Sequence, residues 1–515
     1  MGKKIPMWQV ILVMLFLVVS LMWAMDILFL ITKVPALHCT YGGAHMPLIA
    51  AAIVGGIIAA ANGWKWSFLE AGILASINRS MQACLILMTV GILIGVWIAA
   101  GVVPAMIYYG LFILKPSFFL AACVVLCGIV ALATGSSWTT AGTIGIALIG
   151  IAQGLDMNMY MTAGAIVSGA YFGDKMSPLS DTTNLAPAIA GSNLFDHISH
   201  MVFTVTPSLI ITIVIFFVLG MKHSGDADVN SVYAIQEGLK LGFNISPLLL
   251  IPPVVVIAIV VMKLPALPGL FGGIFVALIL GIFVQGVNGD TWVNVAHFGY
   301  KFELTATDFA PVAANYGQEL ADVTLANLKD LLTRGGMESM LWTVSLIMCA
   351  MCFGGILDCT GMLATLANAL LKVAKGQGGL VTVTVFSCVI VNALAADQYL
   401  SIILPGRMYK QAWEDKRLKG KNLSRCLEDA GTITSCLIPW NTCGATMQSF
   451  LGVKTWGAPG MGYGWYSFLN FINPLVSIFY GFTGITMEKM TEEEYQKLLL
   501  EREKEQEEAL KAAEA

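Results

Sequence analysis

The sequence predicts an all-α polytopic membrane protein with about 10–13 transmembrane helices, an inverted structural repeat, broken helices and re-entrant segments. Three observations lead to this fold class. Hydrophobic residues form 57% of the 515 residues and charged residues only 12%, whereas soluble domains carry about 25% charged residues. Apolar runs of spanning length follow one another along the chain. Polar interruptions recur in the same order in its two halves.

The apolar runs are candidate spans because about 20 apolar residues cross the hydrocarbon core of a bilayer. Two of them, 141–154 and 161–172, are short, and we expect a re-entrant segment among these. The candidate spans are 9–31, 47–61, 81–100, 118–133, 141–154, 161–172, 201–221, 246–262, 269–284, 339–357, 380–396, 432–451 and 465–486.

The runs divide the chain into five segments. These are N-terminal helices (1–80), a first repeat (81–222), connecting helices with a polar loop (223–337), a second repeat (338–486) and a tail (487–515). None of the intervening stretches is long enough for a soluble catalytic domain, and no histidine at membrane depth lies near a serine motif. We therefore expect neither an enzyme nor a cofactor.

Both chain ends are predicted to lie in the cytoplasm. Lys3 and Lys4 precede the first apolar run, in which Asp26 is the only charge and which is too long for the core of a signal peptide. The tail from Glu488 onward alternates acids, bases, leucine and alanine, which is typical of a solvated helix. Two ends on one side of the membrane require an even number of full spans.

An internal repeat relates the two halves at an offset of 260 residues. Identity is low, but the polar interruptions coincide. The matched pairs are 95–101 with 355–361, 135–145 with 395–405 and, after one added residue, Ser180 with Asn441.

Basic residues indicate how the two repeats are oriented. Seven Lys and Arg residues lie between Arg407 and Arg425, whereas the corresponding first-half segment, 150–163, has none. Because positive loops stay in the cytoplasm, the two loops are predicted to lie on opposite faces, so the repeat is inverted. Transporters with inverted repeats bind their substrate near the bilayer midplane, where helices are broken.

Each half contains two polar breaks, 134–140 and 174–184 in the first and 392–401 and 438–444 in the second. Pro178 favours a broken helix in the second of these. Carboxylates, hydroxyls and the carbonyls freed by a broken helix suit Na⁺, and a buried carboxylate can instead take a proton. An Asp–Lys pair that caps a helix at the membrane surface is the alternative interpretation.

Asp397 is the strongest single candidate of the second half, because it is the only charge between Gly376 and Gly406. A helix-end aspartate at the interface is the alternative. The candidate ion or substrate ligands are Asp174, Lys175, Ser177, Ser180, Asp181, Thr182, Asn184, Ser136, Ser137, Thr140, Asn392, Asp397, Asn441 and Thr442. Among them the expected Na⁺ ligands are Asp174, Asp181 and Asp397.

Other titratable residues give weaker signals. Glu428 and Asp429 follow the basic segment and favour a solvated helix start over a role in an access path. His197 and His200 precede a span and favour a surface position over pH sensing. Asp358 interrupts an apolar helix, which fits a pathway residue and a structural one equally well.

The sequence of the breaks resembles the NhaC family of Na⁺/H⁺ antiporters within the ion-transporter superfamily. The resemblance spans 131–207 and 389–453 and rests on GDKMSPLSDTTNLAP at 173–187, with further motifs at 396–406, 423–432 and 438–444. It implies a secondary antiporter of the bacterial inner membrane, active in sodium transport and pH homeostasis. By motif position alone, it carries Asp174, Asp181 and Asp397 over as ion-site candidates.

Two functions remain open at this stage. The first is exchange of Na⁺ for H⁺ by alternating access. The second is Na⁺- or H⁺-coupled exchange of small carboxylates (the malate/lactate type, which the same family includes) or of amino acids. Organic anions usually need a cationic partner, and Lys175 is the only cation in the motif core, so the inorganic ion is favoured. Membrane lipid surrounds the chain, nucleic acid is not expected, and a homodimer is left open.

Overall fold

The computed structural model describes residues 2–24, 33–39, 41, 43–113, 115–223, 229–262, 264–500 and 502. These residues form helices and no strand, apart from one isolated bridge between Leu418 and Lys489. Asp26, which the sequence places in the first span, lies outside the described residues, as do 501 and 503–515 of the predicted tail helix. The predicted all-α polytopic fold is confirmed.

Seven helices of the described chain are long and apolar enough to cross a membrane. One of them combines α14 (Ala266–Leu280) with the π-helical turn that follows it. The other six are α1 (Met7–Ala24), α4 (Trp66–Ala99), α6 (Pro116–Thr134), α11 (Leu194–His223), α18 (Leu341–Cys359) and α20 (Gly376–Leu394).

Shorter apolar helices complete the bundle. They are α3 (His45–Ala61), α5 (Val102–Ile113), α19 (Met362–Val373) and α25 (Phe468–Thr483). A further pair, α12 (Val229–Gly242) and α13 (Ile251–Val261), is bent by 97° and counts as at most one span.

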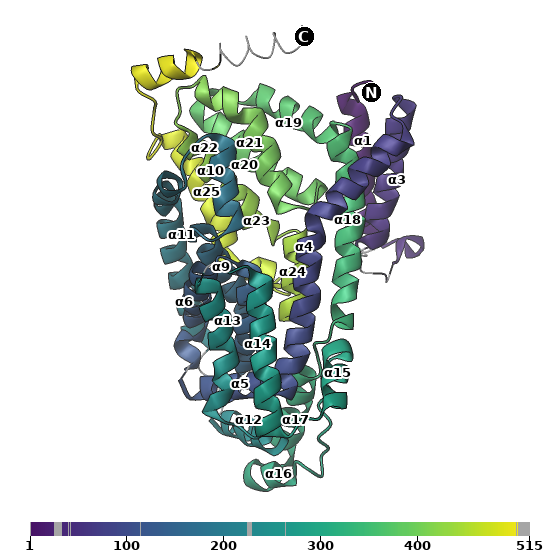
Figure 1. The fold of residues 1–515 in the computed structure, drawn as a ribbon, viewed down its shortest axis with the longest axis vertical. Helices are drawn as coiled ribbons and strands as arrows, with labels where there is room; N and C mark the ends of the chain where they lie inside the picture. Colours follow the sequence, from purple (N-terminus) through teal and green to yellow (C-terminus); the bar gives the residue numbers. More distant parts are fainter. Residues whose placement is uncertain are drawn as a thin grey trace.

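The helix bounds confirm the inverted repeat. Helices α5 and α19 begin 260 residues apart, at Val102 and Met362, and α6 and α20 keep the same offset. Figure 1 shows α5 at the lower end of the molecule and α19 at the upper end, so the two repeats run in opposite directions.

The residue that the second repeat has in addition lies in its first break. Helix α6 is followed by two residues before α7 (Ser137–Thr140), whereas α20 is followed by three before α21 (Gln398–Glu414). From there the offset is 261, as in α10 (Asp181–Ala190) and α24 (Thr442–Leu451). The counterpart of Asp397 is therefore Ser136, and not Ser137 as the sequence alignment had paired it. Both residues cap the N-terminus of a helix.

In each repeat the first break turns the chain back on itself. After α6, the chain returns through α7 and α8 (Ile146–Gly154), and α8 packs against α5. In the second repeat, the Tyr409 hydroxyl on α21 donates to the Ala367 carbonyl of α19 at 2.9 Å. The predicted re-entrant segment 141–154 is confirmed. Residues 407–414, which the sequence presented as part of a basic loop, instead belong to the returning helix α21 of the second hairpin.

The second break of each repeat interrupts a helix without reversing it. In Figure 1, α10 lies above α9 (Met159–Met176), and α24 lies below α23 (Ile433–Ser435). Helix α23 continues α22 (Gly420–Leu427) through the π-helical turn Glu428–Thr432. The expectation that 161–172 is a re-entrant candidate is therefore wrong, because this segment is the first half of a broken span.

The polar connection between the repeats is more ordered than a loop. It forms α15 (Gly289–Phe298), α16 (Ala310–Tyr316) and α17 (Gln318–Leu332) at the lower end of the molecule (Figure 1). Helix α17 folds because its apolar stripe, which includes Leu325 and Leu328, is buried.

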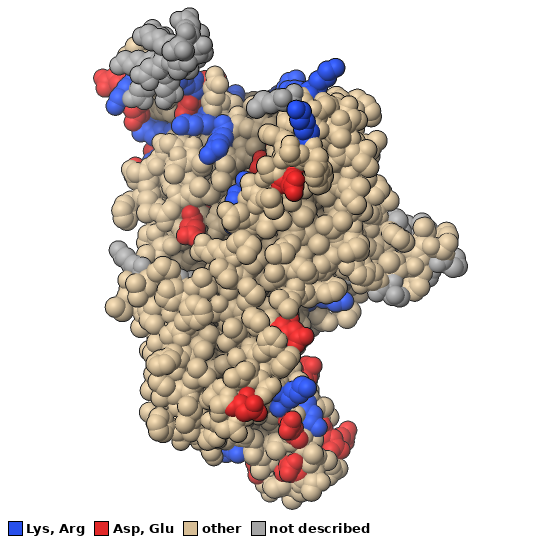
Figure 2. Space-filling view, turned by 45° about the vertical axis from the view of Figure 1, so that its right-hand side comes forward, with Lys and Arg blue, Asp and Glu red and all other residues tan. Residues whose placement is uncertain are grey.

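Charged side chains are most numerous toward the two ends of the molecule, and few lie in the middle of the face shown in Figure 2. The helical residues 492–500 lie at the same end as the start of α1 (Figure 1). Ion pairs attach this C-terminal segment and the residues just before it to the basic stretch 417–421, where α22 begins. The pairs are Arg417–Glu492 at 2.5 Å, Lys419–Glu494 at 3.0 Å and Lys421–Glu488 at 2.6 Å.

Candidate functional site

All four breaks contribute to one cavity of about 720 Å³ at the junction of the two repeats. Helix α4 closes one side with Arg79, Gln82, Ala83 and Ile86, which share one face because they are spaced by three and four residues. The oxygen-bearing side chains of the breaks that line the cavity include Ser136, Asp174, Asp181, Thr182, Asp397 and Thr442. The aspartate-bearing breaks of both repeats therefore line the same cavity.

The first two breaks cross at Gly135. This residue ends α6 in the left-handed conformation, with φ of 66°. A Cβ atom at Gly135 would lie 2.7 Å from the carbonyl carbon of Leu179 in the second break, so only glycine allows the two backbones to approach this closely.

Asp174 is held at this crossing by the start of α7. One of its carboxylate oxygens accepts hydrogen bonds from the Ser137 backbone N–H at 3.1 Å and from the Ser137 hydroxyl at 2.6 Å. Asp181 begins α10 directly after the second break and faces Asp174. The two carboxylates therefore share one wall of the cavity.

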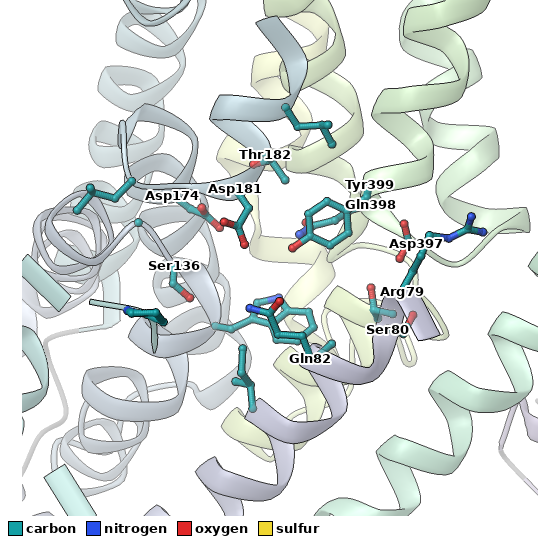
Figure 3. Close-up of a pocket in the computed structure, with 18 of the residues that line it drawn as sticks. Arg79, Ser80, Gln82, Ser136, Asp174, Asp181, Thr182, Asp397, Gln398 and Tyr399 are labelled. Atoms are coloured by element: carbon teal, nitrogen blue, oxygen red, sulfur yellow. The ribbon is translucent and has the colours of Figure 1, made fainter. Parts of the chain in front are cut away.

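Asp397 lies across the cavity and faces Arg79 (Figure 3). It caps α21, since its Oδ1 accepts from the Leu400 N–H at 2.8 Å. The preceding Ala396 has φ of 56°, a strained conformation for a residue with a Cβ atom. The Thr442 N–H holds this turn by donating to the Ala396 carbonyl at 3.0 Å, which ties the third break to the fourth.

The three aspartates share the cavity without forming one ligand cluster. Tyr399 lies between the two walls, with the three carboxylates around it (Figure 3). Within the described chain, no group of three His, Cys, Asp or Glu side chains is arranged to hold one metal ion. The Asp174–Asp181 pair and Asp397 are therefore two separate charged parts of the site.

Several of the predicted ligands brace the breaks instead of lining the cavity. Asn184 is exposed and donates to the carbonyls of Pro178 and Ser180 at 2.9 and 2.8 Å. The Ser177 hydroxyl accepts from the Leu179 N–H at 3.2 Å. Ser180 is buried, and its hydroxyl pairs with that of Thr182 at 3.2 Å.

Three more candidates have the same bracing role. The Thr140 hydroxyl donates to the Ser136 carbonyl at 3.0 Å, within its own helix turn. Asn392 donates to the Gly431 carbonyl at 2.7 Å, and Asn441 donates to the Asn392 carbonyl at 3.0 Å. These buried amides connect the third break to the broken span α22–α24.

Lys175 lies outside the cavity. Its side chain is 0% exposed and forms an ion pair with Asp429. The carboxylate of Asp429 also accepts from Thr204 at 2.9 Å and from Asn473 at 2.7 Å. The cation in the motif core is thus already neutralised, and Arg79 is the basic side chain that lines the cavity among the described residues.

The expected solvated start at Glu428 and Asp429 is wrong, because both residues are 0% exposed. The chain turns at the upper end before Gly420, where α22 begins, so residues 428 and 429 lie two turns inside the molecule. The surface position expected for His197 and His200 is also wrong. They are 0% and 2% exposed and contact Ser424 and Asn422 of α22 at 2.8 and 3.1 Å.

Some lining residues were missed by sequence reasoning. Arg79 pairs with Asp358 at 3.1 Å beside the cavity. It directly precedes the apolar run that begins at Met81 and lies outside all four polar breaks, although its spacing to Gln82 places both on one helix face. Gln398 and Tyr399 directly follow Asp397 and point into the cavity (Figure 3).

Comparison with known proteins identifies related sequences. Residues 169–485 match the Na⁺/H⁺ antiporter family. The chain is 36% identical to the Na⁺/H⁺ antiporter NhaC of Alkalihalophilus pseudofirmus, over 86% of this chain and 91% of that protein. It is 37% identical to the arginine/ornithine antiporter ArcD of Halobacterium salinarum, over 86% and 87%. It is 35% identical to the malate-2H⁺/Na⁺-lactate antiporter of Bacillus subtilis, over 82% and 85%.

Proposed function

We propose that this chain, which belongs to the Na⁺/H⁺ antiporter family, exchanges Na⁺ for H⁺ at the cavity where the four breaks meet. The observation that carries this proposal is the presence of aspartates from both inverted repeats in a single cavity. Inverted repeats that rock against each other around a fixed site give alternating access.

The Asp174–Asp181 pair is the proposed Na⁺ site. Two carboxylates that face each other repel when both are ionised, and either a cation between them or a proton on one of them removes this repulsion. The hydroxyl of Ser136 lines the same cavity and supplies a neutral oxygen. A site of this kind accepts Na⁺ or H⁺, and gains little by holding both.

The charge distribution supports an orientation for the exchanger. Helix α22 begins at the upper end of the molecule (Figure 1), where Figure 2 shows basic side chains, and Lys416, Arg417 and Lys419 directly precede it in the sequence. The connecting helices at the lower end are rich in acids, including Glu319 and Asp322. By the positive-inside rule, the upper end faces the cytoplasm of a bacterial cell.

One observation favours a second candidate, the coupled exchange of a small carboxylate or amino acid. Arg79 lines the cavity opposite the Asp174–Asp181 pair. One of its terminal nitrogens pairs with Asp358, and the remaining N–H donors of its guanidinium supply the cationic partner that an organic anion needs. A volume of about 720 Å³ is also typical of a small-molecule pocket. Relatives named for arginine and ornithine and for malate and lactate are about as similar to this chain as those named for Na⁺ and H⁺ alone.

Purified protein in liposomes distinguishes the two candidates. An imposed Na⁺ gradient with a pH dye inside should move protons without any organic solute, if the proposal is right. Addition of malate, lactate, arginine or ornithine should then leave the rate unchanged. Proton movement that requires one of these solutes, and that is lost in Arg79→Gln, would establish the second candidate instead.

A further inference from the structure

A second polar centre lies behind the wall of the cavity, and we propose that its Glu428 carries the proton of the exchange, with Thr182 connecting it to the cavity. This inference rests on the function proposed above. It separates the proton-carrying group from the Na⁺ site at Asp174 and Asp181. We call this centre, formed by Glu428, Asp429, Lys175 and Arg425, the buried charge centre.

Glu428 has no fixed partner for its charge. The residue is 0% exposed, and neither of its carboxylate oxygens has a hydrogen-bond partner among the described residues. The nearby Thr432 hydroxyl is also without one. Because burial of an isolated ionised carboxylate is very costly, Glu428 must be able to take up a proton.

The surrounding charges also permit the ionised form. Lys175 and Arg425 are two buried cations that share one anion, Asp429, since the Arg425 Nε lies 3.8 Å from the second Asp429 oxygen. Ionised Glu428 therefore makes the centre neutral, and protonated Glu428 leaves it with one positive charge. The net charge of the centre is thus zero or plus one in the two protonation states of Glu428. Glu428 can alternate between these states because neither leaves more than one uncompensated charge in the interior.

The other elements packed against this turn add few further charges. Helix α9 presents Asp174 as well as Lys175, and α10 presents Thr182. Helix α20 presents the Cys388 thiol, and α25 presents Asn473, which is bonded to Asp429. The imidazole of His197, on α11, faces Lys175 and Asp429.

Thr182 provides the connection to the cavity. It is 2% exposed and lines the cavity, and its hydroxyl also faces Glu428. In a transfer, the Glu428 acid gives its proton to the Thr182 oxygen while the Thr182 hydroxyl gives its own proton to water in the cavity that Thr182 lines. No other bond changes. Na⁺ bound beside Asp174 places a positive charge near Glu428 and favours release of this proton.

The repeat shows that the fold itself does not require an acid at this position. Helices α22 and α9 begin 261 residues apart, at Gly420 and Met159, so the counterpart of Glu428 is Val167. Val167 is fully buried in the same kind of broken span. The first repeat thus forms this architecture with an apolar side chain, and the acid in the second repeat needs another explanation.

Two measurements on liposomes test the inference. The first is Na⁺-driven proton movement, and the second is exchange of ²²Na⁺ against Na⁺ at fixed pH. Glu428→Gln should lower the first by about 100-fold, the scale of a lost proton-transfer group. It should keep the second within about twofold. Glu414→Gln, a shielded glutamate at the end of α21, is the matched control and should change neither.

Thr182 variants test the connection even if Glu428→Gln folds poorly. Thr182→Val should slow proton movement, and Thr182→Ser should restore it. The inference is overturned if well-folded Glu428→Gln moves protons at the wild-type rate, or if it lowers proton movement and ²²Na⁺ exchange equally. It is also overturned if Thr182→Val behaves as wild type. A wild-type protein that exchanges Na⁺ without moving protons would instead refute the proposed function, and the inference with it.

Discussion

Ser137 donates two hydrogen bonds to one oxygen of Asp174, from its backbone N–H at 3.1 Å and from its hydroxyl at 2.6 Å. These bonds join the start of α7 to the last turn of α9, so they connect the two breaks of the first repeat. They also place the Asp174 charge at the N-terminal end of a helix, where backbone N–H groups favour an anion. The position of the carboxylate therefore depends on both breaks at once.

Loss of the Ser137 hydroxyl should weaken Na⁺ binding while leaving the fold intact. Ser137→Ala keeps the backbone N–H and removes a hydrogen bond to a charged group, which contributes about 1.5–3 kcal/mol. We expect the apparent KM for Na⁺ to rise by about tenfold or more, measured as transport against Na⁺ concentration. Thr140→Val is the control, because the Thr140 hydroxyl bonds within its own helix turn. An unchanged KM in Ser137→Ala would mean that Asp174 does not contact the ion.

The ion pair between Lys175 and Asp429 should stabilise the protein more than any ion pair at its surface. Asp429→Asn leaves Lys175 without its anion in the interior, which costs about 3–5 kcal/mol. We expect a large fall in the melting temperature in detergent, and partial recovery in the double variant Lys175→Met, Asp429→Asn. The surface pair Arg417–Glu492 is the comparison, and its removal should cost less than about 1 kcal/mol. Equal effects of the two single removals would contradict the buried pairing.

The sequence was sufficient to locate the breaks but not the partners of their side chains. All four breaks were predictable because hydroxyls, amides and acids interrupt apolar runs. The helix α21 was not predictable, since Arg407 and Lys410 give it the composition of a loop and only its packing against α19 and α20 buries it. The partner of Lys175 was not predictable either. It lies 254 residues away in the sequence, and spacing carries no information about such a contact.

The C-terminal segment should detach in acid. A hydrogen bond from Lys421 lowers the pKa of Glu488 from its ordinary value of 4.5. Because the attached state favours the ionised form of Glu488, this contact stabilises the attached segment fully above about pH 4.5. The stabilisation is lost as the pH falls through the lowered pKa. Pepsin cleavage between residues 484 and 500 should therefore increase at the acid end of its range. Lys421→Ala should move that increase to higher pH, and a cleavage profile identical to wild type would contradict this.

Replacement of Asp397 by asparagine should stop exchange without unfolding the protein. Asp397 is the carboxylate that the second repeat contributes to the cavity, so its charge has no substitute on that wall. Asparagine caps helices as well as aspartate does, and Asn441 already fills this role at the fourth break, where it accepts from the Cys443 N–H at 3.0 Å. Na⁺-driven proton movement in liposomes should therefore disappear while the melting temperature stays near wild type. Asp415→Asn, beyond the end of α21, is the control and should exchange normally. If Asp397→Asn exchanges at the wild-type rate, the helix cap is the whole role of Asp397, and Na⁺ is bound by Asp174 and Asp181 without it.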